Sequence, residues 1–263
     1  MAHVKFLHIS DTHFRNDYEG SLDPWELDYD PVAIFEEFLA GYDYTDIDFV
    51  AHTGDLIHDG TQEDYHSLKK LMDKYIPQEI PFFCCLGNHD IKKDFYRGFH
   101  GVDEEGLYCH QETINGYRLI FLDTSQEGSH DGIIDSTQEQ WLFNILEEPS
   151  ENGTLIFQHH PLEISWVSGL EKTQVSDDYI DKLNETDIMG IFTGHLHQNR
   201  HVLLGKIPQH TANSFVFGIN RIEGQLWNTN CLGFSEVEID DQQLDVYTGI
   251  VRPEVKKFNT DII

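Results

Sequence analysis

Basic residues are scarce in this chain. Of its 263 residues, 17 are lysine or arginine and 47 are aspartate or glutamate, so the formal net charge is −30. A field of that sign repels nucleic acid phosphates and anionic lipid, which argues against a nucleic acid polymer or a membrane as partner. A small anionic substrate would need positive charge from another source, and bound metal ions are the obvious one.

Cysteine and long apolar runs are scarce too. The four cysteines are Cys84, Cys85, Cys109 and Cys231, and no Cys-x-x-Cys spacing occurs. This usage indicates buried thiols in a reducing compartment rather than a disulfide framework. No apolar run approaches the roughly 18 residues that span a bilayer, and the N-terminal residues lack the layout of a signal peptide. We therefore expect a soluble, cytoplasmic protein.

The remaining composition is that of a folded protein with a large core. Hydrophobic residues make up 39% of the chain and aromatic residues 12%, which suffices for a substantial interior. No internal repeat, low-complexity stretch or Gly/Ser/Pro linker divides the sequence. We therefore predict a single domain over residues 1–263, and the sequence leaves a homo-oligomer open.

Hydrophobic periodicity predicts strands alternating with helices, followed by a β-rich region, which indicates an α/β protein. Strands are expected at 4–10, 47–53, 80–86, 154–158 and 188–193. Helices are expected at 31–42, 61–75, 138–146 and 175–183, with Asp30 and Thr61 as N-caps of the first two. Further strands are expected at 107–110 and 117–123, paired through a turn at Asn115-Gly116, and at 200–204, 208–212, 232–239 and 243–249.

Polar side chains directly follow five of the predicted strands. They are Asp11 and His13, Asp55, Asn88 and His89, His159, and His195 and His197. Ligands in α/β folds gather outside the carboxyl ends of strands. Residues two apart in an extended segment point the same way, so each closely spaced pair can face one point. We therefore expect these side chains to converge.

The chemistry of these side chains indicates metal binding. Imidazole nitrogen mixed with carboxylate and amide oxygen suits transition metals such as Mn, Fe, Co, Ni or Zn. The seven candidate ligands are Asp11, His13, Asp55, Asn88, His159, His195 and His197. Because seven ligands are too many for one tetrahedral site, we expect two divalent or trivalent ions that share a bridge. Asp55 stands without a paired ligand, and its two oxygens suit the bridging position.

The blocks that carry these residues resemble the motifs of a known family, the calcineurin-like metallophosphoesterases. They are Asp-x-His at 11–13, Gly-Asp at 54–55, Gly-Asn-His-Asp at 87–90, His-x-Pro at 159–161 and Gly-His-x-His at 194–197. The order and spacing of the blocks are compatible with that family. The resemblance implies a two-sheet mixed β-sandwich flanked by helices, in four layers α/β/β/α.

The resemblance also implies how the ligands divide. One metal would be held by Asp11, His13, Asp55 and His197, and the second by Asp55, Asn88, His159 and His195. A metal-bound hydroxide would attack the phosphorus of a phosphoester. His89 would bind the phosphate and protonate the leaving alkoxide, and Asp90 would orient His89.

The stretches 8–13, 54–56 and 87–90 look most like class III cyclic nucleotide phosphodiesterases, so a 3′,5′-cyclic nucleotide is the expected substrate. Two departures weaken that assignment. Leu162 stands where those enzymes often have a second proline, and His58-Asp59 replaces a commonly acidic pair. A phosphomonoesterase, a glycerophosphodiesterase and a nucleotide pyrophosphatase on the same centre remain alternatives.

Several residues have two interpretations at this stage. His160 competes with His159 as a ligand, and we prefer His159 because the family ligand lies two residues before the proline. His58 is a candidate outer partner of the ligands, and residues 212–214 are candidates to line the pocket. The aromatic residues Trp25, Tyr29, Phe35, Phe38 and Tyr42 fit a helix core better than a base-stacking wall. A scaffold that had lost its chemistry is disfavoured, because all seven ligands and His89 are present.

Overall fold

A computed structural model describes residues 2–18, 27–164, 172–223, 225–241 and 243–251. Trp25 lies outside these residues, so the prediction for it is not addressed. No helix in the described part of the chain is long and apolar enough to cross a membrane. All four cysteines are free, as their spacing predicts.

The first sheet has five strands in the order β15-β14-β1-β2-β3. Their bounds are β1 (His3–Ile9), β2 (Phe49–Thr53), β3 (Phe82–Cys85), β14 (Leu232–Asp240) and β15 (Gln243–Val251). Strands β1, β2 and β3 are parallel, whereas β14 is antiparallel to both β1 and β15. The sheet is therefore mixed, and the late β-rich region of the chain completes it beside the first strand.

The second sheet has six strands in the order β10-β11-β9-β7-β5-β4. Their bounds are β4 (His110–Ile114), β5 (Tyr117–Phe121), β7 (Thr154–Phe157), β9 (Ile188–Thr193), β10 (Arg200–Leu204) and β11 (Ile207–Thr211). The four inner strands are parallel, and β4 and β10 are antiparallel edges. Asn115 and Gly116 join β4 to β5 with φ of 50° and 79°, the positive values that a tight hairpin turn favours.

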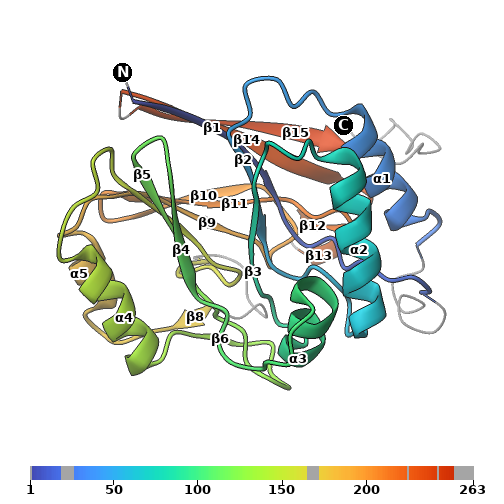
Figure 1. Cartoon of the computed structure of the whole chain (residues 1–263), viewed down its shortest axis with the longest axis horizontal. Coiled ribbons are helices and arrows are strands. Elements are labelled where there is room, and N and C mark those ends of the chain that lie inside the picture. Colours follow the sequence, from blue (N-terminus) through green and yellow to red (C-terminus); the bar gives the residue numbers. More distant parts are fainter. Residues whose placement is uncertain (1, 19–26, 165–171, 224, 242, 252–263) are drawn as a thin grey trace.

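The two sheets pack face to face, and helices cover both outer faces (Figure 1). Helices α1 (Pro31–Gly41), α2 (Gln62–Tyr75) and α3 (Lys92–Phe95), with the π-helix Tyr96–His100, lie on the side of the first sheet. Helices α4 (Ser136–Leu146) and α5 (Tyr179–Leu183) lie on the side of the second sheet. The predicted α/β/β/α sandwich is confirmed.

Successive side chains of a strand point to opposite faces of the sheet, and here both faces are buried. Each strand of the sandwich can therefore contribute to two layers of the core. In β1, Val4 and Phe6 belong to the core between the sheets, whereas Leu7 and Ile9 belong to the core under the helices. Aromatic rings fill the space between the sheets: the Phe6 and Phe49 rings stack with centroids 4.6 Å apart. The aromatic residues of α1 also pack inward, since Phe35 is buried and Phe38 packs against the same core, as predicted.

Side chains begin the first two helices as the sequence predicts. The Asp30 carboxylate accepts hydrogen bonds from the Val32 and Ala33 amides at the start of α1. Thr61 and Asp64 form a capping box at the start of α2. Each cap marks the point at which the loop after β1 or β2 ends and a helix begins. The polar residues of these loops therefore lie in a segment that is fixed at both ends.

Two predicted elements are wrong in their bounds. The strand expected at 107–110 is β4 at His110–Ile114, because the Asp123 carboxylate holds the amide of Tyr108 before the ladder begins. The helix expected at 175–183 begins at Tyr179, and the Ser176 hydroxyl bonds instead to Asp178 and Glu139. The short strands β6 (Gly132–Ile133), β8 (Thr173–Gln174), β12 (Gly218–Ile222) and β13 (Gln225–Thr229) were not predicted.

Candidate metal centre

The loops that carry the predicted ligands meet at one end of the sandwich. The ligands follow parallel strands of both sheets: Asp11 and His13 follow β1, Asp55 follows β2, Asn88 follows β3, His159 follows β7, and His195 and His197 follow β9. Backbone hydrogen bonds fix neighbouring loops against each other. The amides of Asp11 and His13 donate to the carbonyls of Gly54 and Asp55, each at 3.0 Å. Hydrogen bonds between the loops therefore fix the backbone from which these candidate ligands converge.

The backbone at this end is in an uncommon conformation. Six of its residues other than glycine have positive φ: Asp11, His13, Asp55, Asp59, His195 and His197, with values from 43° to 69°. Such angles are rare outside glycine and cluster at functional sites. The side chains of Asp11 and His13 converge through these turns and not through an extended segment, so the reasoning from strand alternation was wrong although its outcome holds.

Asp11, His13 and His197 form the first group of candidate ligands, and all three side chains are buried. His197 Nε2 lies 3.2 Å from Asp11 Oδ1 and 3.2 Å from His13 Nε2. His13 Nε2 lies 3.9 Å from Asp11 Oδ1. Two ring nitrogens and a carboxylate oxygen therefore face one another in a space shielded from water.

His159, Asn88 and Asp55 form the second group. His159 Nε2 lies 3.3 Å from Asp55 Oδ2 and 3.2 Å from Asn88 Oδ1. The ring of His195 is next to that of His159, with centroids 5.2 Å apart. The backbone amide of His195 also donates to both oxygens of Asp11, at 3.2 and 3.0 Å, which ties this group to the first.

Asp55 lies between the two groups. Its Oδ2 is 3.5 Å from His13 Nε2 and 3.3 Å from His159 Nε2. Its other oxygen, Oδ1, accepts a hydrogen bond of 2.8 Å from the backbone amide of His89. The carboxylate is thereby held at a fixed angle, with one oxygen directed at both groups.

Backbone carbonyls set the tautomers of two ligand histidines. His159 Nδ1 lies 2.7 Å from the carbonyl of Thr53, and His197 Nδ1 lies 2.8 Å from the carbonyl of Phe217. Because a carbonyl only accepts, Nδ1 is the nitrogen that carries the proton when either ring is neutral, as it is when a metal ion is bound. Each Nε2 then has a lone pair directed into the centre, which is the arrangement that metal-binding histidines use.

The charges at the centre are strongly coupled. Burial alone would lower the pKa of His159, but the neighbouring carboxylate of Asp55 raises it to about 9. Burial would raise the pKa of Asp55, yet the histidines around it, His159 foremost, hold it well below its usual range. Burial lowers the pKa of His195 to about 3. The centre therefore holds an ionised carboxylate among imidazoles, one of which is protonated in the absence of metal.

The catalytic pair predicted within Gly87-Asn88-His89-Asp90 is arranged differently. His89 Nδ1 lies 3.2 Å from Asp59 Oδ1, so Asp59 and not Asp90 is the carboxylate beside the ring. Asp90 is buried, and its carboxylate accepts hydrogen bonds from the Leu56, Ile57 and Gly87 amides and the Tyr65 hydroxyl, at 2.9 to 3.2 Å. The prediction that Asp90 orients His89 is corrected, since Asp90 instead ties the β2 loop to the β3 loop.

Glycine is required at two positions beside the ligands. Gly54 has φ of +86°, and a Cβ atom there would lie 2.7 Å from the Gly87 nitrogen and 2.8 Å from His159 Nδ1. A Cβ on Gly194 would lie 2.6 Å from Asp11 Oδ2. Both distances are too short for real contacts, so a side chain at either position would displace a ligand.

The choice of His159 over His160 stays a prediction, because ring nitrogens of His159, His160 and His195 all lie within 4.8 Å of one another. His160 Nδ1 lies 2.8 Å from the Thr124 hydroxyl and its Nε2 lies 3.1 Å from the carbonyl of His130, so both ring nitrogens have hydrogen-bond partners within the protein.

Residues 212–214 contact the backbone of a candidate ligand. The hydroxyl of Ser214 donates to the carbonyl of Asp11 at 3.0 Å.

Sequence reasoning did not single out His130, which lies beside the candidate centre. His130 Nδ1 lies 3.0 Å from Asn88 Nδ2, and its ring centroid is 5.4 Å from that of His89. The amide of Asn88 donates through Nδ2 to this ring and so directs Oδ1 at His159. His130 lies in a loop between β5 and β6, and no periodicity or motif marks it.

These donors fit transition metal ions. Imidazole nitrogen, carboxylate oxygen and amide oxygen converge at the distances given above. His195 Nε2 is buried without a hydrogen-bond partner among the described residues, an arrangement that costs free energy unless another group satisfies it. The structure thus contains groups of histidine and aspartate suited to a metal centre, in accord with the sequence prediction.

Comparison with known proteins agrees with this geometry. A probable cyclic nucleotide phosphodiesterase from Rhodococcus erythropolis is 28% identical over 254 residues, covering 90% of this chain and 80% of that protein. A cAMP/cGMP dual specificity phosphodiesterase from Mycobacterium tuberculosis is 29% identical over 220 residues, covering 79% of this chain and 66% of that protein.

Solved structures and family patterns extend the comparison. The purple acid phosphatase structure from yellow lupin seeds is similar in fold, with a TM-score of 0.55 at 14% identity over 95% of this chain and 52% of that chain. Residues 4–199 match the calcineurin-like phosphoesterase pattern and include all seven candidate ligands. The chain therefore belongs to the calcineurin-like phosphoesterase family, whose members are metal-dependent phosphoric ester hydrolases.

Proposed function

We propose that this protein is a phosphodiesterase with a dinuclear metal centre. One metal site consists of Asp11, His13, Asp55 and His197, and the other of Asp55, Asn88, His159 and His195. The position of Asp55 Oδ2, within 3.5 Å of both His13 Nε2 and His159 Nε2, is the observation that supports this most. A single oxygen directed at both groups suits a ligand that two ions share.

His89 is the proposed general acid. When bound, two metal ions would lower the pKa of a water molecule to supply the nucleophile and would neutralise the phosphoryl oxygens. Burial would lower the pKa of His89, but the carboxylates of Asp55 and Asp59 raise it above its ordinary value, which favours the protonated ring. Nδ1 donates to Asp59, and Nε2 then has a proton for the leaving alkoxide.

A 3′,5′-cyclic nucleotide is the proposed substrate. The names of the relatives from R. erythropolis and M. tuberculosis support it, and both matches cover more than three quarters of this chain. His130 adds a ring beside Asn88 and His89 at the exposed rim of the centre. An aromatic ring there suits contact with the part of a substrate that extends beyond the phosphate.

A substrate panel tests this assignment. Protein with measured Mn²⁺ content is assayed against cyclic nucleotides, glycerophosphodiesters, phosphomonoesters, nucleotide pyrophosphates and bis-p-nitrophenyl phosphate. We expect the highest kcat/KM with a 3′,5′-cyclic nucleotide. A higher value with a glycerophosphodiester would overturn the substrate but keep the phosphodiesterase. No turnover with any substrate or divalent metal would contradict the enzyme and favour a scaffold.

Substitution of Asp55 tests the shared ligand. Asp55→Asn keeps the shape of the side chain and an oxygen for the His89 amide but removes the charge between the two groups. We expect the affinity for both metal ions to fall, so that metal analysis after gel filtration finds well under two per chain. Asn88→Ala, which alters only the second group, should lose one ion. Two ions retained in Asp55→Asn would show that Asp55 is not the bridge.

Substitution of His89 tests the acid. His89→Ala should keep both metal ions and lose about 10²- to 10⁴-fold in kcat with a cyclic nucleotide, the usual size of general-acid catalysis. The loss should be smaller with bis-p-nitrophenyl phosphate, because p-nitrophenolate leaves without protonation. An equal loss with both substrates would contradict the acid role, and His66→Ala, on the exposed face of α2, serves as the control.

The pH dependence of the metal-free protein tests the pairing of His159 with Asp55. The folded pKa of about 9 lies above the ordinary value of 6.5, so this pair stabilises the fold below pH 6.5 and the stabilisation is lost as pH rises through 9. A shift of that size corresponds to about 3 kcal/mol. Urea unfolding at pH 6, 7.5 and 9.5 should show the decline in metal-free protein and a flatter profile in His159→Gln. Equal slopes in both proteins would contradict the pairing.

A further inference from the structure

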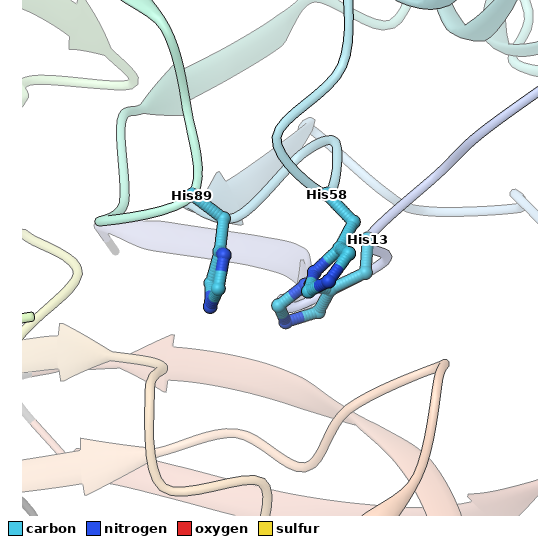
Figure 2. A group of neighbouring side chains, drawn as sticks. All are labelled: His13, His58 and His89. Carbon is cyan, nitrogen blue, oxygen red and sulfur yellow. The ribbon is translucent and has the colours of Figure 1, made fainter. Parts of the chain in front are cut away.

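His58 occupies an unusual place beside the proposed metal centre. It follows Asp55 by three residues, in the loop where the sequence departs from the family pattern, and it is 7% exposed. His58 Nδ1 lies 3.0 Å from His13 Nδ1, the ring nitrogen of His13 that faces away from Asp11, Asp55 and His197. Figure 2 shows the two rings together, with His89 projecting beside them from a separate loop.

The contact between His58 and His13 is built into the backbone. Phe14 and Ile57 form a parallel bridge, and the amide of His13 donates to the carbonyl of Asp55 at 3.0 Å. Arg15 Nη1 donates to the carbonyl of His58 at 2.8 Å. These contacts fix the loop after β1, which carries His13, against the loop after β2, which carries His58.

The direction of this hydrogen bond follows from the chemistry of metal binding. An Nδ1–Nδ1 contact of 3.0 Å needs one proton between the two nitrogens. A histidine that binds a metal through Nε2 has no proton there, so its Nδ1 carries the proton and donates it. His13 directs Nε2 at Asp55 and His197. His58 must then accept with Nδ1 and carry its own proton on Nε2.

We infer that His58 is a positioning residue that accepts the Nδ1 proton of His13 and so presents His13 Nε2 to the first metal ion. The inference rests on the proposed metal centre and adds to it a residue outside the seven ligands. His159 and His197 use backbone carbonyls for the same purpose. A carbonyl can only accept, whereas His58 can accept or donate, so the direction of this hydrogen bond depends on the tautomers of both rings.

A ligand role for His58 is less consistent with the geometry. Ring nitrogens of His13, His58 and His89 lie within 4.8 Å of one another, which is close enough for a further metal ion. However, the Nδ1 of His58 is already engaged by His13, and its ring packs on His89 with centroids 4.5 Å apart and planes inclined by 31°. Because His58 also contacts His89, activity alone cannot separate these roles, and metal affinity is the decisive readout.

Three variants of His58 separate the effect of the hydrogen bond from that of the space that the ring fills. His58→Asn places an amide oxygen near the position of Nδ1 and keeps the acceptor. His58→Leu has nearly the same shape without an acceptor, and His58→Gln moves the amide toward the position of Nε2. Mn²⁺ titration calorimetry on metal-free protein measures each site, and His66→Leu, on the exposed face of α2, is the control.

Wild-type protein and His66→Leu should bind two Mn²⁺ ions. His58→Leu and His58→Gln should weaken one site about 10- to 100-fold, the usual effect of losing such a partner, and His58→Asn should stay near wild type. Wild-type affinity in both His58→Leu and His58→Gln, or equal weakening in His58→Asn, would overturn the inference. A third Mn²⁺ ion lost on substitution would make His58 a ligand, which also overturns it. Fewer than two Mn²⁺ ions in the wild type would instead contradict the proposed centre.

Nitrogen-15 NMR supplies a readout that does not depend on affinity. In Zn²⁺-loaded protein, long-range proton–nitrogen correlations should show the His58 proton on Nε2 and the His13 proton on Nδ1. The His58 signals are assigned by their loss in His58→Asn. A proton on Nδ1 of His58 in the loaded protein would show that His58 donates, and it would overturn the inference.

Discussion

One carboxylate organises this end of the molecule. Asp55 comes from the first sheet, and its Oδ2 lies 3.5 Å from a histidine of that sheet and 3.3 Å from His159 of the second sheet. The interior between the two sheets is filled by apolar and aromatic contacts, which hold layers together but have little directionality. A buried charge does not tolerate displacement, because it loses its partners and cannot regain water. The register of the sheets at this end therefore depends on Asp55.

In the loop that begins at Asp55, consecutive residues contact different parts of the candidate site. Asp55 faces both ligand groups, the amides of Leu56 and Ile57 bind Asp90, His58 contacts His13, and Asp59 contacts His89. Positive φ at Asp55 and Asp59 lets neighbouring side chains leave the loop in different directions. At His58-Asp59, which replaces a commonly acidic pair, the histidine thus contacts a candidate ligand histidine, and the aspartate keeps a carboxylate beside the proposed acid.

Much of the fold and of the candidate site could be predicted, because strand periodicity and polar strand ends are local signals. The sandwich was implied by the resemblance of the motif blocks to a known family, whereas the caps at Asp30 and Thr61 and the convergence of the seven candidate ligands follow from these local signals. The role expected of Asp90 did not, since adjacent residues in a turn point in different directions that periodicity cannot assign. His130 could not be found from the sequence either, because tertiary packing alone brings its loop to Asn88.

The most direct test is to locate the metal ions. Crystals of Mn²⁺-loaded protein, measured with X-rays above the manganese absorption edge, give an anomalous difference map that marks each ion. The account predicts two peaks about 3.5–4 Å apart, as in two-metal sites generally, with the carboxylate of Asp55 between them. A single peak, or two peaks that Asp55 does not join, would contradict it.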